Sequence, residues 1–325
     1  MAFSIRSYLR PPTSCTIMIS RRNIRVKVMQ TLYTVSAFES EVKPGDPQKL
    51  LQKHFDQSKE LVQYFIYWIV EVASYAERDA YIRSGKHLPT KEDLSVSTKI
   101  AGNEVIWKIK EDAILKQDWE SWKPEARVDK ELVKKLYNQL AESDIYKRYI
   151  TTPSREFKSE RDVVNYIFEE LLLPNEAFIA HLEEMYSNWD DDGEMVVQLV
   201  KAYLQKPGSA DFIHFIPADK ALFARDLLRT VLEKSEHLES FIFPKLKNWD
   251  AERIAALDMI LMKMGVAEFL YFETIPPKVT INEYIELAKE YSTQQSGQFV
   301  NGILDNIHKD LLQANKLHKK DFKKA

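Results

Sequence analysis

Glycine, cysteine and long uncharged apolar runs are all scarce in this chain of 325 residues. Only eight glycines are present, which disfavours a loop-rich or Rossmann-type architecture. The single cysteine, Cys15, excludes an internal disulfide and a cysteine-based zinc site, and it favours the reducing cytoplasm. The most apolar stretches, 64–70 and 254–272, predict no membrane span, because the first is too short and the second is interrupted by charges.

Catalytic motifs are also missing from the sequence. The seven histidines are scattered, with no His-Glu-x-x-His pattern, and no glycine-rich phosphate loop accompanies them. Residues 188–193 imitate the start of a calcium loop, but Leu199 stands where the loop needs a bidentate glutamate. A capped helix start is the better interpretation of that stretch. We therefore expect no enzyme, no cofactor and no metal site.

Charge is distributed unevenly along the chain. The formal net charge is −3, yet residues 1–38 carry +6 and residues 316–325 carry +4, which leaves −13 for the residues between them. A basic head and tail on an acidic body indicate localised contact with a polyanion. The alternative is a solvated basic segment at each end, which composition alone slightly favours.

Apolar residues recur at spacings of three and four through most of the chain, which predicts an all-α protein. An N-cap and proline at 46–47 begin one long helix, which Gly85 closes. The stretch 94–116 is ambiguous, because its branched and aromatic residues also favour strands. Further helices are predicted over 130–142, 160–173, 175–186, 193–205, 217–234, 250–272, 280–291 and 297–310.

Residues 20–38 predict an amphipathic helix with one basic flank. The stripe expected to face the core consists of Ile24, Val28, Leu32 and Val35. The adjoining flank carries Arg22, Arg25, Met29 and Tyr33. Guanidinium groups bind phosphates and planar groups stack on unpaired bases, so this flank suits RNA. The alternative is a surface of ion pairs in which Tyr33 is half-buried packing.

The C-terminal region predicts closely packed helices. Thr280 and Glu283 have the spacing of a capping box, which would begin a helix at that point. Gly302 lies inside the last predicted helix, where glycine costs about 1 kcal/mol against alanine. We expect a neighbouring backbone to approach Gly302 closely.

Three segments resemble one known family in their order and spacing. They read RRNIR followed by QTLY over 21–33, KVTINEYIELAK over 278–289, and SGQFVNGILD over 296–305. Together they resemble the bacterial transcription antitermination factor NusB, a family of helical RNA-binding proteins. The resemblance covers less than half of the chain.

The resemblance implies NusB-like stacked helical bundles with an additional helical insertion. Residues 1–17 are expected to be disordered; they are similar to an organelle transit peptide, although we prefer translation that begins at Met18. The expected parts are 18–40 with 212–246 as the N-terminal bundle, 41–211 as the insertion, 247–310 as the C-terminal bundle, and 311–325 as a basic tail.

The resemblance also implies a non-catalytic, cytoplasmic adaptor that binds boxA-like RNA in nascent, including ribosomal, transcripts. Its expected partners are NusE, a small-subunit ribosomal protein, and the RNA polymerase antitermination complex. RNA contacts are expected at Arg21, Arg22, Arg25, Tyr33, Gln295, Gln298 and Phe299. NusE contacts are expected at Glu252 and Asp258. The alternative function is a helical protein–protein interaction module without RNA binding.

Overall fold

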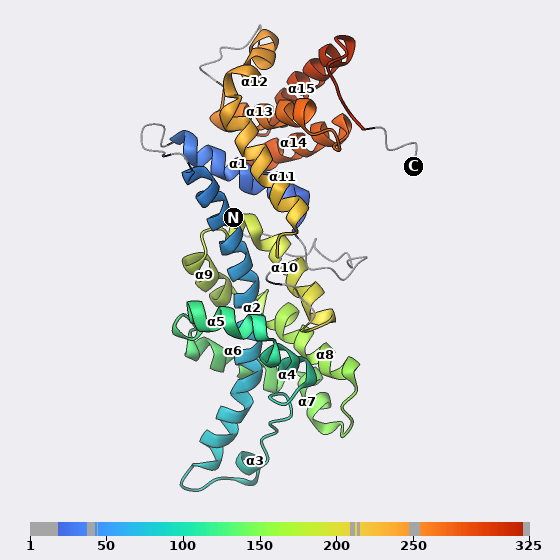
Figure 1. Cartoon of the computed structure of the whole chain (residues 1–325). Coiled ribbons are helices and arrows are strands. Elements are labelled where there is room, and N and C mark those ends of the chain that lie inside the picture. Colours follow the sequence, from blue (N-terminus) through green and yellow to red (C-terminus); the bar gives the residue numbers. More distant parts are fainter. Residues whose placement is uncertain are drawn as a thin grey trace. The chain divides into compact units, whose positions relative to one another are not determined.

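Every regular element that the computed structural model describes is helical, which confirms the all-α prediction for these residues (Figure 1). The structure describes residues 19–37, 43, 45–208, 212, 215–246 and 254–320. The helices are α1 (Arg21–Ala37), α2 (Asp46–Ser84), α3 (Lys91–Leu94), α4 (Glu104–Glu111), α5 (Ala113–Trp122), α6 (Lys130–Glu142), α7 (Asp144–Thr151), α8 (Phe157–Tyr166), α9 (Glu176–Met185), α10 (Trp189–Gln205), α11 (Ala218–Glu233), α12 (Ser235–Ile242), α13 (Ala256–Tyr271), α14 (Pro277–Tyr291) and α15 (Ser296–Gln313).

The chain divides into two compact units. The terminal unit comprises Ile19–Phe55 and Ile216–Ala325, and the insertion unit comprises Asp56–Phe215. Helix α2 contributes residues to both units. The resemblance placed the ends of the insertion at 41 and 211, whereas the compact unit spans Asp56–Phe215 and so begins within α2.

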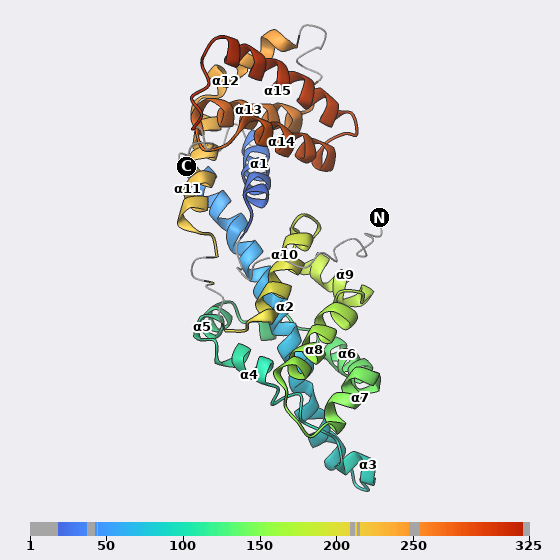
Figure 2. The ribbon, with the colours of Figure 1, turned by 90° about the vertical axis from the view of Figure 1, so that its right-hand side faces the viewer.

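Helix α13 is the centre of the terminal unit. It packs against α1, α11, α12, α14 and α15, and Figures 1 and 2 show these helices gathered around it. Its buried side chains therefore point in all directions rather than along one stripe, as expected of a helix enclosed by others. They include Ile260, Leu261, Met262, Met264, Val266, Ala267 and Phe269.

Helix α1 is buried on more than one side, because α11 and α13 both pack against it. Ile24, Val28 and Leu32 of the predicted core stripe are buried, and Val35 is half-buried. Met29, which the sequence placed on the basic flank, is also buried. A single amphipathic stripe thus underestimates how much of this helix is covered.

The start of α14 differs from the predicted capping box. The helix begins at Pro277, with Pro276 in the N-cap position, so Thr280 lies inside its first turn. Proline is well suited to this first position, since its fixed φ is helical and it lacks an N–H that would go unsatisfied. The prediction of a capping box at Thr280 and Glu283 was therefore wrong. Thr280 is instead buried.

The insertion unit has an aromatic core built around α2. The Phe65 ring contacts those of Phe168, Phe178 and Trp189 at centroid separations of 5.3–5.6 Å. At the start of α10, the buried Asp192 accepts hydrogen bonds from Ser58 and Asn188, which accounts for part of the acidic run there. The ambiguous stretch 94–116 forms α4 and the start of α5, with Asn103 capping α4 through bonds from two backbone amides.

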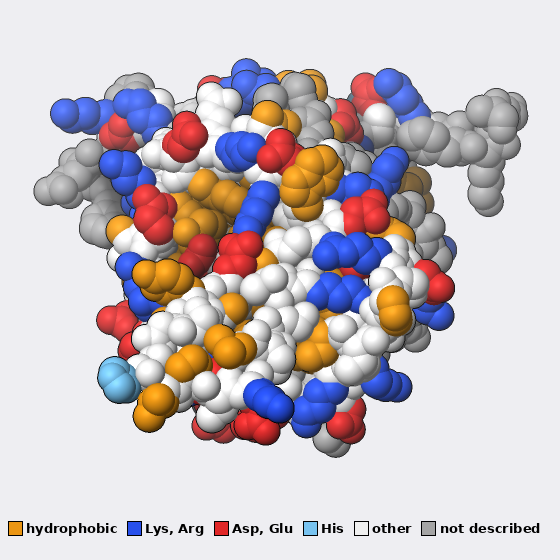
Figure 3. All heavy atoms as spheres, turned by 90° about the horizontal axis from the view of Figure 1, so that it is seen from below, with side chains coloured by type: hydrophobic (Ala, Val, Ile, Leu, Met, Phe, Trp, Pro, Cys, Tyr) orange, Lys and Arg blue, Asp and Glu red, His pale blue; other side chains and the backbone are white. Residues whose placement is uncertain are grey.

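Among the described residues, no helix combines the length and apolar character needed to cross a membrane. Large hydrophobic side chains are nevertheless exposed on the insertion unit, where Tyr81, Ile82, Leu88 and Leu94 fall within one short stretch. Figure 3 shows hydrophobic side chains gathered with charged ones on the face seen from below.

Close approach of helices in the terminal unit occurs at Gly265 rather than at Gly302. A Cβ added at Gly265 would lie 2.8 Å from Leu304 Cδ2 and 3.4 Å from Tyr284 Cδ2, whereas one at Gly302 would meet nothing within 4 Å. The expectation for Gly302 was wrong, because its face of α15 is exposed.

We predict opposite effects for alanine at these two glycines. Gly265→Ala should reduce the free energy of unfolding by about 1–3 kcal/mol through overpacking against the buried Leu304. Gly302→Ala should raise it by up to about 1 kcal/mol, because alanine favours the helix. Thermal unfolding followed by circular dichroism would measure both. A Gly265→Ala protein as stable as the wild type would contradict the packing described here.

Candidate nucleic-acid interface

Two arginines occupy the first turn of α1. Ser20 precedes the helix, and its Oγ accepts a hydrogen bond from the Asn23 amide at 3.2 Å, as an N-cap does. Arg21 and Arg22 therefore lie beside the positive end of the helix dipole, which is unfavourable for cations until an anion neutralises them. The start of α1 thus favours negatively charged ligands.

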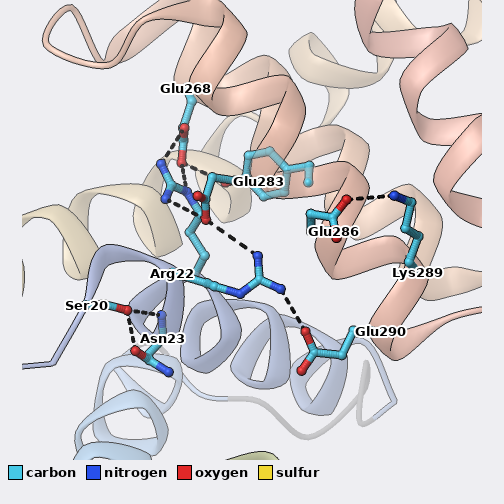
Figure 4. A network of polar contacts seen from close by, with 10 residues as sticks. Ser20, Arg22, Asn23, Glu268, Glu283, Glu286, Lys289 and Glu290 are labelled. Carbon is cyan, nitrogen blue, oxygen red and sulfur yellow. Dashed lines mark hydrogen bonds and ion pairs between the residues drawn. The ribbon is translucent and has the colours of Figure 1, made fainter. Parts of the chain in front are cut away.

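A buried ion pair fixes α1 against α13. Arg25 Nε lies 2.7 Å from Glu268 Oε1, and Arg25 Nη2 lies 3.1 Å from Glu268 Oε2. The same carboxylate accepts hydrogen bonds from Thr280 Oγ1 and Tyr284 OH of α14, each at 2.8 Å. Glu268 thus receives four hydrogen bonds from two other helices. Figure 4 shows its carboxylate among the surrounding polar side chains.

Electrostatics keep the buried Arg25 protonated. Burial by itself would lower the pKa of Arg25, but the charge and hydrogen bonds of Glu268 offset burial and hold that pKa above its usual range. Burial raises the pKa of Tyr284, and the neighbouring Glu268 carboxylate raises it further, so the phenol remains a hydrogen-bond donor.

The expectation that Arg25 projects into solvent was wrong, since only 2% of this residue is exposed. The reason is its position opposite Glu268, which turns the guanidinium inward. Arg25 therefore has a structural role, and we leave it out of the RNA-contacting set.

Arg22 stays at the surface, where it faces α14. Its Nη2 lies 2.8 Å from Glu290 Oε2, its Nη1 lies 4.0 Å from Glu283 Oε2, and 38% of its side chain is exposed. The Glu283 carboxylate also lies 3.5 Å from Arg25 Nη1, so it links the surface arginine to the buried one (Figure 4). A phosphate that bound Arg22 would compete with Glu290.

A second surface cation sits beside Arg21, which is exposed at the start of α1. Lys220 of α11 donates a hydrogen bond from Nζ to the Ile19 carbonyl at 2.7 Å. The Arg21 guanidinium lies 5.6 Å from the centroid of the Phe223 ring. Lys220 could not be placed here from the sequence, because nothing in its local pattern ties it to residues two hundred positions earlier.

The other predicted RNA segment begins near Arg22. Glu290 stands five residues before Gln295, so the short connection from α14 to α15 starts beside the surface arginine. Gln295 and Gln298 are exposed, and Phe299 is half-buried. These residues and the first turn of α1 belong to one unit and border the same end of α14.

Tyr33 lies apart from the first turn of α1. It is 51% exposed, but twelve helical positions separate it from Arg21, a distance of about 18 Å along the axis. A phosphate bound at Arg21 therefore could not lie against the Tyr33 ring.

The two residues expected to face NusE have different outcomes. Asp258 is only 5% exposed, so its expected surface position was wrong. It accepts a hydrogen bond from Ser296 Oγ at 2.8 Å and thereby holds the start of α15 against α13. Glu252 lies outside the described residues.

Part of the basic C-terminal segment folds back onto α13. Lys319 Nζ donates to the Glu268 and Phe272 carbonyls at 2.7 and 2.8 Å, where a cation is favoured by the helix dipole. Burial lowers the pKa of Lys319 to about 8, although Glu268 and Glu273 oppose the shift. This lysine is a structural cap rather than a free cation.

Comparison with known proteins identifies the family. Residues 181–309 match the NusB family. The chain is 38% identical over 138 residues to the transcription antitermination protein NusB of Salinibacter ruber, covering 42% of this chain and 82% of that protein. The chain belongs to the NusB family.

Two further NusB proteins are similar to the chain. That of Methylacidiphilum infernorum is 38% identical over 125 residues, which cover 36% of this chain and 87% of the relative. That of Chloroherpeton thalassium is 36% identical over 134 residues, covering 39% and 64% respectively. The NusB family match leaves residues 56–180 of the insertion unit outside it, so the resemblance is confirmed together with the greater length of this chain.

The buried ion pair predicts that Arg25 contributes far more than Arg22 to the free energy of unfolding. Arg25→Ala would leave the Glu268 carboxylate buried without its counter-charge, which costs about 3–5 kcal/mol. Arg22→Ala removes a half-exposed pair worth less than about 1 kcal/mol. Urea denaturation followed by circular dichroism would compare them. Equally small losses of unfolding free energy for both variants would show that Arg25 does not hold α1 against α13.

Lys319 predicts a pH dependence of stability. Its folded-state pKa of about 8 lies below the ordinary 10.5, so between these values the unfolded chain binds more protons and stability rises with pH. The unfolding free energy of the wild type should therefore rise relative to Lys319→Met from pH 8 to 9.5, by less than about 1.4 kcal/mol per pH unit. Lys320→Met makes the same charge change at an exposed position. If both variants followed one pH profile, the half-buried position of Lys319 against α13 would be wrong.

Proposed function

We propose that this chain, a transcription antitermination factor of the NusB family, binds a boxA-like single-stranded segment of nascent transcripts together with NusE. It would act as a non-catalytic adaptor in the RNA polymerase antitermination complex, and a cytoplasmic location is part of the same proposal. Family membership supports the general role. The RNA contact rests on residues at the start of α1.

The observation that carries the proposal is the pair of surface cations held by a rigid buried anchor. Arg21 and Arg22 follow the N-cap of α1, while Arg25 fixes the same helix three residues later through Glu268. Cations on a preorganised helix lose little freedom when they bind phosphate, which favours affinity. The exposed amides of Gln295 and Gln298 could add hydrogen bonds to unpaired bases.

Removing the two surface arginines should weaken RNA binding without unfolding the protein. For Arg21→Ala with Arg22→Ala, we expect reduced affinity for boxA RNA, and the log–log salt slope should fall by about 1.4, or about 0.7 for each phosphate contact of a single strand. Electrophoretic mobility shifts at several salt concentrations would measure both. The charge-matched control is Arg225→Ala with Arg229→Ala on the exposed side of α11. An equal loss of RNA affinity in the control would show that only the net charge of the protein matters.

Glu290 should restrain RNA binding by competing for Arg22. Glu290→Gln removes the carboxylate charge 2.8 Å from the guanidinium, so affinity for boxA RNA should rise by up to about 5-fold, the equivalent of a surface ion pair. Glu286→Gln is the matched control, because Glu286 instead pairs with Lys289 of its own helix. No gain from Glu290→Gln would remove Arg22 from the proposed interface.

The NusE partnership has a separate test. Purification of the chain from cells, with analysis of both bound RNA and bound protein, should recover boxA-containing transcripts and NusE together. Recovery of NusE without RNA would favour the alternative of a protein–protein interaction module.

A further inference from the structure

Helices α4 and α8 of the insertion unit bring two cations onto one aromatic ring. Lys108 Nζ of α4 lies 4.8 Å from the centroid of the Phe157 ring, and Arg161 Cζ of α8 lies 5.9 Å from it. The ring stands at the first position of α8 and is half-exposed. Both helices lie in the insertion unit and outside the NusB family match.

The residue next to Lys108 in the chain carries an exposed indole. Trp107 precedes Lys108 on α4, and 60% of it is accessible to solvent. An indole is a large flat ring, so an exposed one next to a cation in the chain offers a stacking surface for an unpaired base. We call Trp107, Lys108, Phe157 and Arg161 the α4–α8 surface.

The charges of the α4–α8 surface favour a polyanion over an apolar protein partner. Among the described residues, Arg161 makes no ion pair, and its Nε is buried without a hydrogen-bond partner. Lys108 pairs with Glu104 one turn earlier, at 2.7 Å, and both side chains are substantially exposed. An exposed pair of this kind contributes little, so phosphate could replace the carboxylate.

We propose that the α4–α8 surface binds a second stretch of single-stranded RNA, in the same transcript that the terminal unit holds. The inference rests on the proposed function for the identity of that transcript. An unpaired base would stack on Trp107 while Lys108 and Arg161 contact phosphates, the combination by which proteins hold single strands without reading sequence. The insertion would thereby lengthen the RNA footprint beyond boxA.

Extended RNA tests the inference on the full chain. A boxA 12-mer would be compared with the same RNA carrying 15 uridines on each side, by fluorescence anisotropy. Wild-type protein should bind the extended RNA about 10-fold more tightly, and Trp107→Ala should lose this gain while binding the 12-mer as before. Trp107→Phe, which keeps a stacking ring, should retain most of the gain.

Tyr81→Ala is the matched control, because Tyr81 is an exposed aromatic residue of the same unit and is not part of the α4–α8 surface. It should leave the gain intact. A wild type that binds both RNAs equally, or a Trp107→Ala protein that keeps the gain, would overturn the inference. So would weaker NusE binding by Trp107→Ala with unchanged RNA binding, since it would identify a protein site.

The two proposals fail in different ways. If the 12-mer does not bind, boxA recognition is wrong, and a 30-nucleotide uridine strand then tests the α4–α8 surface by itself. Binding of that strand that depends on Trp107, with photo-crosslinks from 4-thiouridine to residues 104–111, would support the surface. Crosslinks confined to the terminal unit would contradict it.

Discussion

One buried ion pair organises the terminal unit. Glu268 sits on the central helix α13 and receives donors from α1 and α14, so three helices are fixed at one carboxylate. A buried charge is costly unless every lone pair is satisfied, and four hydrogen bonds meet that condition here. The pair decides which arginines reach the surface. Because Arg25 turns inward, Arg21 and Arg22 are left at the exposed end of the helix.

Periodicity predicted most helices of this chain, because their apolar spacing reflects local geometry alone. The orientation of polar residues could not be predicted in the same way. A repeat of 3.6 residues places Arg25 with Arg22, but whether a guanidinium meets water or a carboxylate depends on a partner 243 residues away. Asp258 was misjudged for the same reason, since Ser296 approaches from another helix. The close contact at Gly265 likewise depends on α15.

The cations of the two candidate RNA surfaces have different partners. In the terminal unit, Arg22 of α1 already pairs with Glu283 and Glu290 of α14. An anion that fits this surface poorly therefore gains little by binding there. On the α4–α8 surface, Lys108 and Arg161 both lie against the Phe157 ring, and Lys108 also pairs with Glu104. The first arrangement suits selective contacts that must displace a carboxylate, and the second suits tolerant contacts with a flexible strand.

The distance along the chain between Arg25 and Glu268 bears on how the protein forms on the ribosome. The two residues are 243 positions apart, and translation proceeds at about 5–20 residues per second. Helix α1 therefore emerges tens of seconds before its counter-charge exists. During that interval the insertion unit can fold around its own aromatic core, while α1 still lacks the ion pair with Glu268. The family domain thus cannot be completed before α13 has been synthesised.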